Sequence, residues 1–97
     1  MMVGSDMDNP IQHDVKAHRF NTVVDDVTGY VEYELAGDVM TITHTIVPSA
    51  IGGRGIAGAL VKAALEHARA ESWKVVTQCS YADSWMRKHP DYEGLRA

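Results

Sequence analysis

Hydrophobic and polar residues alternate with two different periods along this chain, and the change of period separates a strand-rich part from a helical part. Residues 30–35 and 39–47 alternate with a period of two, which is typical of half-buried strands. From Ile56 until Glu71 the hydrophobic side chains recur at three- and four-residue spacings, which is typical of an amphipathic helix. With a shorter strand predicted at 20–24, the first three strands form an antiparallel meander.

The chain after this helix is predicted to complete a β-α-β unit. Residues 73–80 read as a fourth strand, and residues 82–89 have the pattern of a short helix that ends before Pro90. Because a helix connects the third strand to the fourth, these two strands are expected to run parallel through a right-handed crossover. The predicted fold class is therefore α+β, an antiparallel meander plus one β-α-β unit with a glycine-rich turn and a short C-terminal helix.

The length and charge of the chain limit the number of domains that it can form and the kinds of partner that it is expected to bind. Residues 1–18 show neither period and are predicted to form a flexible arm, while residues 19–97 are enough for one domain with a modest core. The formal net charge is −4 and only Arg87-Lys88-His89 is locally basic, so a nucleic-acid partner is not expected. No apolar run approaches membrane-spanning length and the first residues lack the features of a secretory signal, so we expect no membrane partner and a cytoplasmic location.

Four glycines, Gly52, Gly53, Gly55 and Gly58, lie between the third strand and the helix. Glycine allows left-handed backbone angles, and a glycine-rich turn leaves successive N–H groups free of side-chain cover. With the positive end of the helix dipole behind them, such N–H groups form an anion site suited to a phosphate or pyrophosphate. The alternative is that the glycines only make a tight loop and let the helix pack close to a strand.

The cysteine and the histidines are the remaining candidates for chemistry. The five histidines fit no compact ligand spacing and the single cysteine offers no Cys-x-x-Cys motif, so no metal site is predicted. Cys79 ends the fourth strand and lies at the same sheet edge as the glycine turn, where it is either a nucleophile or a buried residue that never reacts. His44 is expected on one strand face with Met40, Ile42 and Ile46, which favours a core histidine over a general base.

Four short motifs follow one another at suitable spacings. They are His44-Thr45-Ile46-Val47-Pro48, Arg54-Gly55-Ile56-Ala57, Gln78-Cys79-Ser80-Tyr81 and His89-Pro90-Asp91-Tyr92. Together they resemble the short single-domain branch of the GCN5-related N-acetyltransferases, over residues 19–95. The superfamily's strand, Gln/Arg-x-x-Gly-x-Gly/Ala turn and helix falls on 52–57, with glycine where Gln or Arg is usual.

This resemblance implies that the chain binds acetyl-coenzyme A. Backbone groups around Ile46 and Val47 would pair with the pantetheine arm, which runs between the third and fourth strands. The pyrophosphate would be held by the backbone of the glycine turn, at Gly53, Arg54, Gly55, Ile56 and Ala57.

The resemblance also implies an acyltransferase that moves an acetyl group to an amine, on a small molecule or on a protein lysine. Cys79 is its candidate nucleophile and His44 its candidate base. Many larger members use a tyrosine after the fourth motif strand as general acid, but this chain has Trp85 near that place and only Tyr81 as a weak substitute. Two other readings stay open, a coenzyme A-binding module without turnover that acts through a protein partner, and a structural interaction domain.

Overall fold

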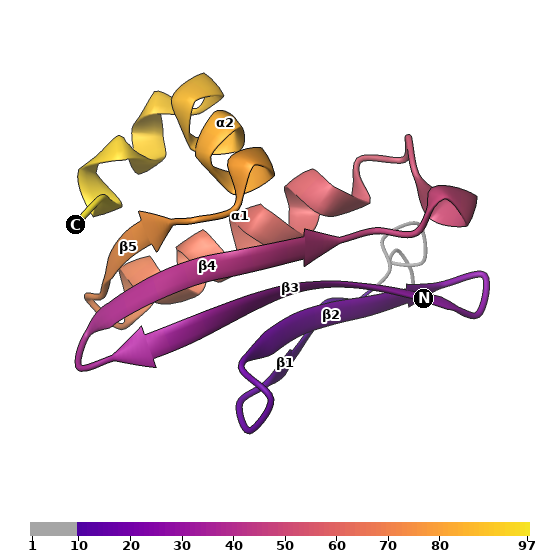
Figure 1. Ribbon diagram of the computed structural model, residues 1–97, viewed down its shortest axis with the longest axis horizontal. Coiled ribbons are helices and arrows are strands. Elements are labelled where there is room, and N and C mark those ends of the chain that lie inside the picture. The colour runs from indigo at the N-terminus through magenta and orange to yellow at the C-terminus, as the bar shows by residue number, and fades with distance from the viewer. Residues whose placement is uncertain (1–9) are drawn as a thin grey trace, which may run out of the picture.

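The computed structural model describes residues 10–97 as one five-stranded sheet with two α-helices and two 3-10 helices (Figure 1). The strands lie in the order β1-β2-β3-β4-β5, with β4 and β5 parallel and each other neighbouring pair antiparallel. This arrangement confirms the predicted α+β class. The elements are β1 (Gln12–Asp14), β2 (Arg19–Val24), β3 (Val27–Ala36), β4 (Val39–Ile46), η2 (Ser49–Ile51), α1 (Ile56–Ala70), β5 (Lys74–Thr77), α2 (Ser80–Lys88) and η3 (Pro90–Leu95).

Helix α1 crosses behind the sheet in Figure 1 and covers one of its faces. Isolated helices of this length are marginal in water, so tertiary burial of the apolar stripe stabilises α1. Each large side chain fully buried in this way contributes about 1.5–3 kcal/mol. The stripe falls where the periodicity predicts it, at Leu60, Val61, Ala64, Leu65 and Ala68, all of them fully buried.

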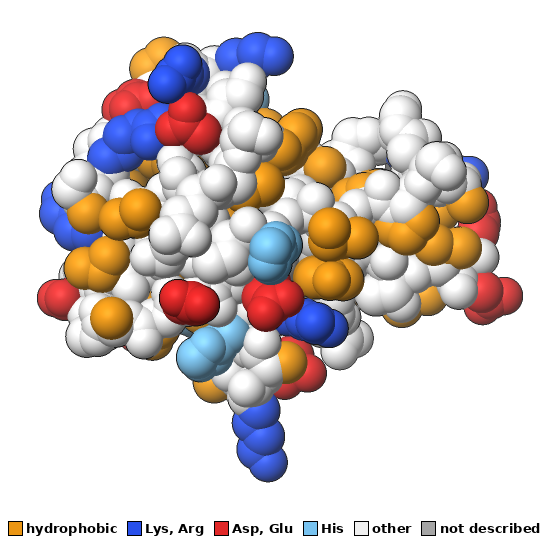
Figure 2. Space-filling view, in the orientation of Figure 1, with side chains coloured by type: hydrophobic (Ala, Val, Ile, Leu, Met, Phe, Trp, Pro, Cys, Tyr) orange, Lys and Arg blue, Asp and Glu red, His pale blue; other side chains and the backbone are white. Residues whose placement is uncertain are grey.

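The opposite face of the sheet is open over β2, β3 and β4 in the described part of the chain (Figure 1). Figure 2 looks onto this outer face and shows charged, histidine and hydrophobic side chains interspersed on it. Arg19 of β2 pairs there with Glu32 of β3 at 3.4 Å and stacks over the Tyr30 ring, 4.2 Å from its centroid. An antiparallel sheet with one solvated face is stable in this form. Among residues 10–97, no helix is both long and apolar enough to cross a membrane.

A bulge in β4 overturns the expected orientation of His44. The register pairs Tyr33 with Ile42 but Glu32 with His44, so Thr43 is an extra residue outside the pairing, although its hydroxyl donates to the Glu32 carbonyl oxygen at 3.2 Å. Such a bulge breaks the alternation of a strand. Met40 and Ile42 therefore remain in the core, whereas His44 and Ile46 are exposed on the outer face. The prediction that His44 shares a face with Met40 and Ile42 is wrong, and only its grouping with Ile46 holds.

The N-terminal part of the sheet begins earlier than the sequence indicates. Residues 1–9 of the predicted arm lie outside the described residues. The remainder of the arm contains β1, which pairs antiparallel with β2. A three-residue strand is too short to show a clear alternation, so its position depends on tertiary contacts. His13 supplies them by stacking on Phe20 at 4.0 Å between ring centroids and by a hydrogen bond with the Tyr33 hydroxyl at 2.6 Å.

Candidate functional site

The strands β4 and β5 separate at one end of the sheet. Their pairing stops at Ile42 and Thr77, although β4 continues to Ile46. The N–H groups of Gln78 and Cys79 both donate to the Ile42 carbonyl oxygen, at 2.9 and 3.2 Å, and the chain then turns into α2. The predicted fourth strand at 73–80 is therefore too long, and β4 beyond Ile42 is left unpaired on that side in the described structure (Figure 1).

The glycine turn lies between the end of β4 and the start of α1. Gly53 and Gly55 have φ angles of 76° and 77°, which few L-residues adopt, so glycine is required at both places. A Cβ atom built on either one would meet no atom within 4 Å among residues 10–97, so the turn is open to the outside. Gly55 is the N-cap of α1 and Ile56 its first residue, and the first turn of α1 contains no acidic residue. Within residues 10–97, no side chain caps the free N–H groups at this end of α1.

The first turn of α1 packs against side chains of α2. A Cβ atom on Gly58, in the first turns of α1, would stand 3.0 Å from Trp85 Nε1 and 3.4 Å from the Tyr81 hydroxyl oxygen of α2. These contacts are tighter than ordinary van der Waals contact, so a larger residue at this place would require the Trp85 and Tyr81 side chains to shift. Both helices begin at the sheet edge where β4 and β5 separate.

Cys79 is the N-cap residue of α2 and is half-buried. Its Sγ atom lies 3.3 Å from Thr45 Oγ1, across the gap between the strands. Burial raises the pKa of the Cys79 thiol, but the hydrogen bonds with the Thr45 hydroxyl and the backbone N–H groups of Ala82 and Tyr81 outweigh it and lower the pKa below its ordinary value. A lowered pKa increases the fraction of reactive thiolate at neutral pH.

The structure does not bring His44 to the thiol. Thr45 pairs with Val31 on the covered side of the sheet, whereas His44 pairs with Glu32 on the outer side. Side chains of successive strand residues point to opposite faces, so the His44 ring lies across the sheet from Cys79. Of the two predicted catalytic residues, only Cys79 thus faces the gap between the strands.

The predicted cofactor-binding residues do lie around this gap and the turn. Ile46 ends β4 with 43% of its surface exposed, and Val47 follows it, half-buried. Arg54, in the turn, points to the β2–β3 hairpin, where its Nη1 atom lies 2.9 Å from Asp25 Oδ2. Both side chains of this ion pair are well exposed, so it is a weak surface interaction.

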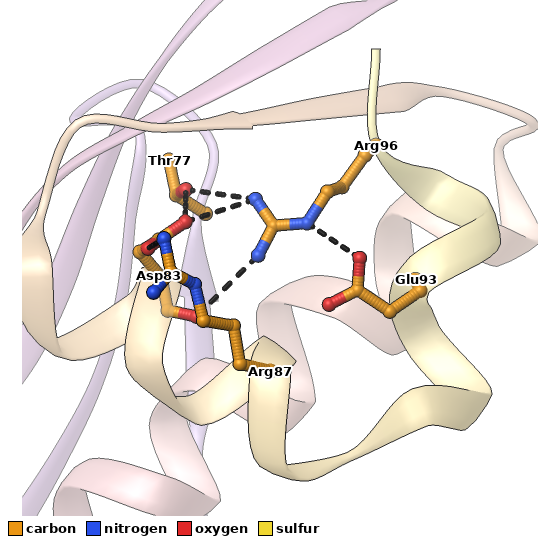
Figure 3. A network of polar contacts seen from close by, with 5 residues as sticks. All are labelled: Thr77, Asp83, Arg87, Glu93 and Arg96. Atoms are coloured by element: carbon orange, nitrogen blue, oxygen red, sulfur yellow. Dashed lines mark hydrogen bonds and ion pairs between the residues drawn. The ribbon is translucent and has the colours of Figure 1, made fainter.

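A polar network fixes the first turn of α2 (Figure 3). The Asp83 carboxylate accepts hydrogen bonds from Thr77 Oγ1 at 2.9 Å and from Arg96 Nη1 at 3.0 Å. These two hydrogen bonds are the main causes that hold the pKa of Asp83 below its ordinary value. Arg96 is itself held by Glu93, whose Oε1 atom lies 2.7 Å from Nε.

Sequence reasoning missed Thr45, Asp83 and Arg96. Asp83 had a local signal, since an acidic residue is favoured in the first turn of a helix. Thr45 and Arg96 had none, because their roles depend on contacts between residues far apart in the chain, 34 positions for Thr45 and Cys79 and 13 for Asp83 and Arg96.

Comparison with known proteins agrees with this geometry. The family model of the GCN5-related N-acetyl-transferases matches residues 19–95. The chain belongs to the GCN5-related N-acetyltransferase family. The family membership expected from the four motifs is thereby confirmed.

The chain is similar to several known proteins over more than half of its length. Protein NATD1 of Gallus gallus is 32% identical over 83 residues, which cover 82% of this chain and 76% of the relative. Protein NATD1 of Homo sapiens is 39% identical over 59 residues, 60% of this chain and 52% of the relative. The NMR solution structure of a GCN5-like protein from Staphylococcus aureus superposes with a TM-score of 0.72 at 26% identity, over 91% of this chain and 87% of that one.

Proposed function

We propose that this protein is an acetyl-coenzyme A-dependent N-acyltransferase that moves an acetyl group to an amine. One observation carries the proposal: the uncovered glycine turn at the start of α1 and the first residues of α2 lie at the same edge of the sheet, where β4 and β5 separate. The helix ends offer N–H donors to an anionic group. The unpaired end of β4 offers backbone groups to an extended ligand.

The residues of the turn fit the pyrophosphate of coenzyme A. The left-handed glycines Gly53 and Gly55 expose backbone N–H groups without covering side chains, and Arg54, Ile56 and Ala57 supply the neighbouring ones. The pantetheine arm carries amide groups, which match the unpaired backbone of Ile46 and Val47 at the end of β4. From the glycine turn, the path of the pantetheine arm along the end of β4 leads to the gap in which Cys79 faces Thr45.

Acetyl-coenzyme A supplies an acetyl group activated as a thioester. In the route that the structure favours, the Cys79 thiolate attacks the carbonyl carbon, the new Sγ–C bond forms and the bond to the coenzyme A sulfur breaks. Coenzyme A leaves and takes up a proton. The acceptor amine then attacks the acetyl group, the C–N bond forms, and the Sγ–C bond breaks as the amine loses its proton.

A direct route needs no acyl-cysteine. The amine attacks the thioester itself, and a base takes its proton as the coenzyme A sulfur leaves. His44 serves this route only if the acceptor approaches from the outer face, on which its exposed ring lies. Cys79 has the support of a lowered thiol pKa and of its place in the gap, so the acyl-cysteine route is the one that we propose.

Mass spectrometry of the intact protein separates these possibilities. After incubation with acetyl-coenzyme A, we expect the wild-type protein to gain one acetyl group that hydroxylamine removes. The Cys79→Ala variant should gain none and should lose transfer to amines such as lysine peptides and small amines, while His44→Gln should keep both.

Two other results would count against this proposal. Transfer that survives in Cys79→Ala but falls in His44→Gln would establish the direct route in place of the acyl-cysteine. Neither adduct nor transfer, with coenzyme A binding intact in all three proteins, would contradict turnover altogether and identify a coenzyme A-binding module that acts through a protein partner.

A further inference from the structure

The segment from Thr77 to Asp83 contains Cys79, and it is fixed at both of its ends. The Asp83 backbone N–H donates to the Cys79 carbonyl oxygen at 3.0 Å, which closes the first turn of α2. The Asp83 side chain reaches back to Thr77 Oγ1 at 2.9 Å, at the end of β5. The thiol therefore depends on this closed loop for its position relative to the N–H groups of Tyr81 and Ala82.

Arg96 holds that loop from outside. Its Nη1 atom donates to Asp83 Oδ1 at 3.0 Å and lies 3.3 Å from Thr77 Oγ1, while Nη2 lies 3.4 Å from the Asp83 carbonyl oxygen (Figure 3). One planar guanidinium thus contacts both the strand end and the helix start. A guanidinium presents several N–H donors in a fixed fork, which makes such a multiple contact rigid.

The main chain around Arg96 is anchored as well. Residues 96 and 97 lie along β5, where Arg96 bridges to Val75 and the Ala97 N–H donates to the Val75 carbonyl oxygen at 2.9 Å. The Arg96 side chain is 30% exposed, and Glu93 holds its Nε at 2.7 Å. Arg87 pairs with the same Asp83 carboxylate at 3.1 Å but is 75% exposed, and no hydrogen bond joins it to Thr77 Oγ1 or to the Asp83 carbonyl oxygen in the described structure.

We propose that Arg96 is a positioning residue for Cys79, because it locks the strand end and the first turn of α2 that together hold the thiol. The proposal rests on the chemical role proposed above for Cys79. By holding this turn, Arg96 keeps the N–H groups of Tyr81 and Ala82, which lower the pKa of the thiol, in place beside Sγ.

The test is the rate of alkylation of Cys79 by iodoacetamide as a function of pH, which needs neither acetyl-coenzyme A nor turnover. Arg96→Gln should move the midpoint of the profile to higher pH and slow the reaction at neutral pH by about threefold or more. Arg87→Gln is the matched control, since it removes the exposed partner of the same carboxylate, and its profile should coincide with that of the wild type.

Arg96→Lys keeps the proposal testable if Arg96→Gln does not fold. Lysine retains the charge but cannot contact Asp83 and Thr77 at once, so its profile should shift in the same direction by a smaller amount. A role limited to stability would lower the melting temperature and leave the midpoint unchanged in the folded variants. Coincident midpoints for wild type and the folded Arg96 variants would overturn the proposal, whatever the fate of acetyl transfer.

Discussion

At the scale of single residues, Gly58 shows how one missing side chain lets α2 pack closely on the first turn of α1. Trp85 is held on its other side by His89, whose ring stacks on it at 3.7 Å and whose Nδ1 lies 2.7 Å from the Trp85 carbonyl oxygen. The indole is therefore poorly able to move away from a Cβ atom that would lie 3.0 Å from its Nε1.

We therefore expect Gly58→Ala to gain none of the roughly 1 kcal/mol that alanine normally adds to a helix interior. Denaturant unfolding measures this difference, and Gly94→Ala, where an added Cβ meets no described atom within 4 Å, is the control for handling and expression. A full gain in the free energy of unfolding for Gly58→Ala would show that α2 moves freely and does not constrain the site.

The properties of individual site residues could be predicted only in part from the sequence. The glycine turn could be predicted because Gly53 and Gly55 carry their own conformational signal, which the positive φ angles confirm. The lowered pKa of Cys79 could not, because it arises from Thr45 on another strand and from a helix that starts earlier than the pattern at 82–89 indicates. The roles of Cys79 and His44 in catalysis stay predictions.

At the scale of elements, His13 adds side-chain contacts to the main-chain pairing of β1 with β2. Its ring stacks on Phe20, accepts or donates a hydrogen bond at the Tyr33 hydroxyl, and meets the edge of His67 on α1 at 4.5 Å. Burial lowers the pKa of His13 first, and the nearby His67 and His18 lower it further, while Asp14 opposes the shift.

The sign of the resulting pH dependence follows from linkage. Because the pKa of His13 in the folded state lies below its ordinary value of 6.5, the unfolded state binds the proton more readily. This contribution to stability is complete above pH 6.5 and is lost as the pH falls from there toward the lowered pKa.

The free energy of unfolding should therefore be smaller at about pH 5.5 than at about pH 7.5, and His13→Gln should reduce that difference. Urea unfolding at the two pH values measures it, with His44→Gln, exposed on the outer face, as the matched histidine control. An equal pH difference in wild type and His13→Gln would exclude His13 as its source.

Local periodicity predicted which segments form helices and strands, but it did not predict where each one begins and ends. The stripe of α1 and the alternation of β3 were predictable because each covers several repeats of its period. The bulge at Thr43 was not, since its sequence, a run of alternating threonines, fits an unbroken strand equally well. One extra residue was enough to turn His44 from the core to the outer face.

At the scale of the whole molecule, the candidate site exists only because distant parts of the chain end at one place. The glycine turn follows β4, Cys79 follows β5, and the parallel crossover through α1 brings both to the same sheet edge. The sequence predicted this convergence from topology alone. It could not predict how α2 packs on the first turn of α1, because that contact depends on how closely Trp85 fits against Gly58.

The most direct test of the proposed site is a titration of backbone amide NMR signals with coenzyme A, together with the melting temperature. At about 1 mM coenzyme A we expect a raised melting temperature and perturbed amides at 53–57 and 79–82, because a ligand that binds the folded state alone stabilises it. Gly55→Val should abolish both effects, since valine disfavours a φ of 77° and covers the N–H groups, whereas Arg54→Ala should keep them. Absence of any thermal shift and of any perturbation at these amides in the wild-type protein, or full affinity in a folded Gly55→Val protein, would contradict a coenzyme A site at this turn.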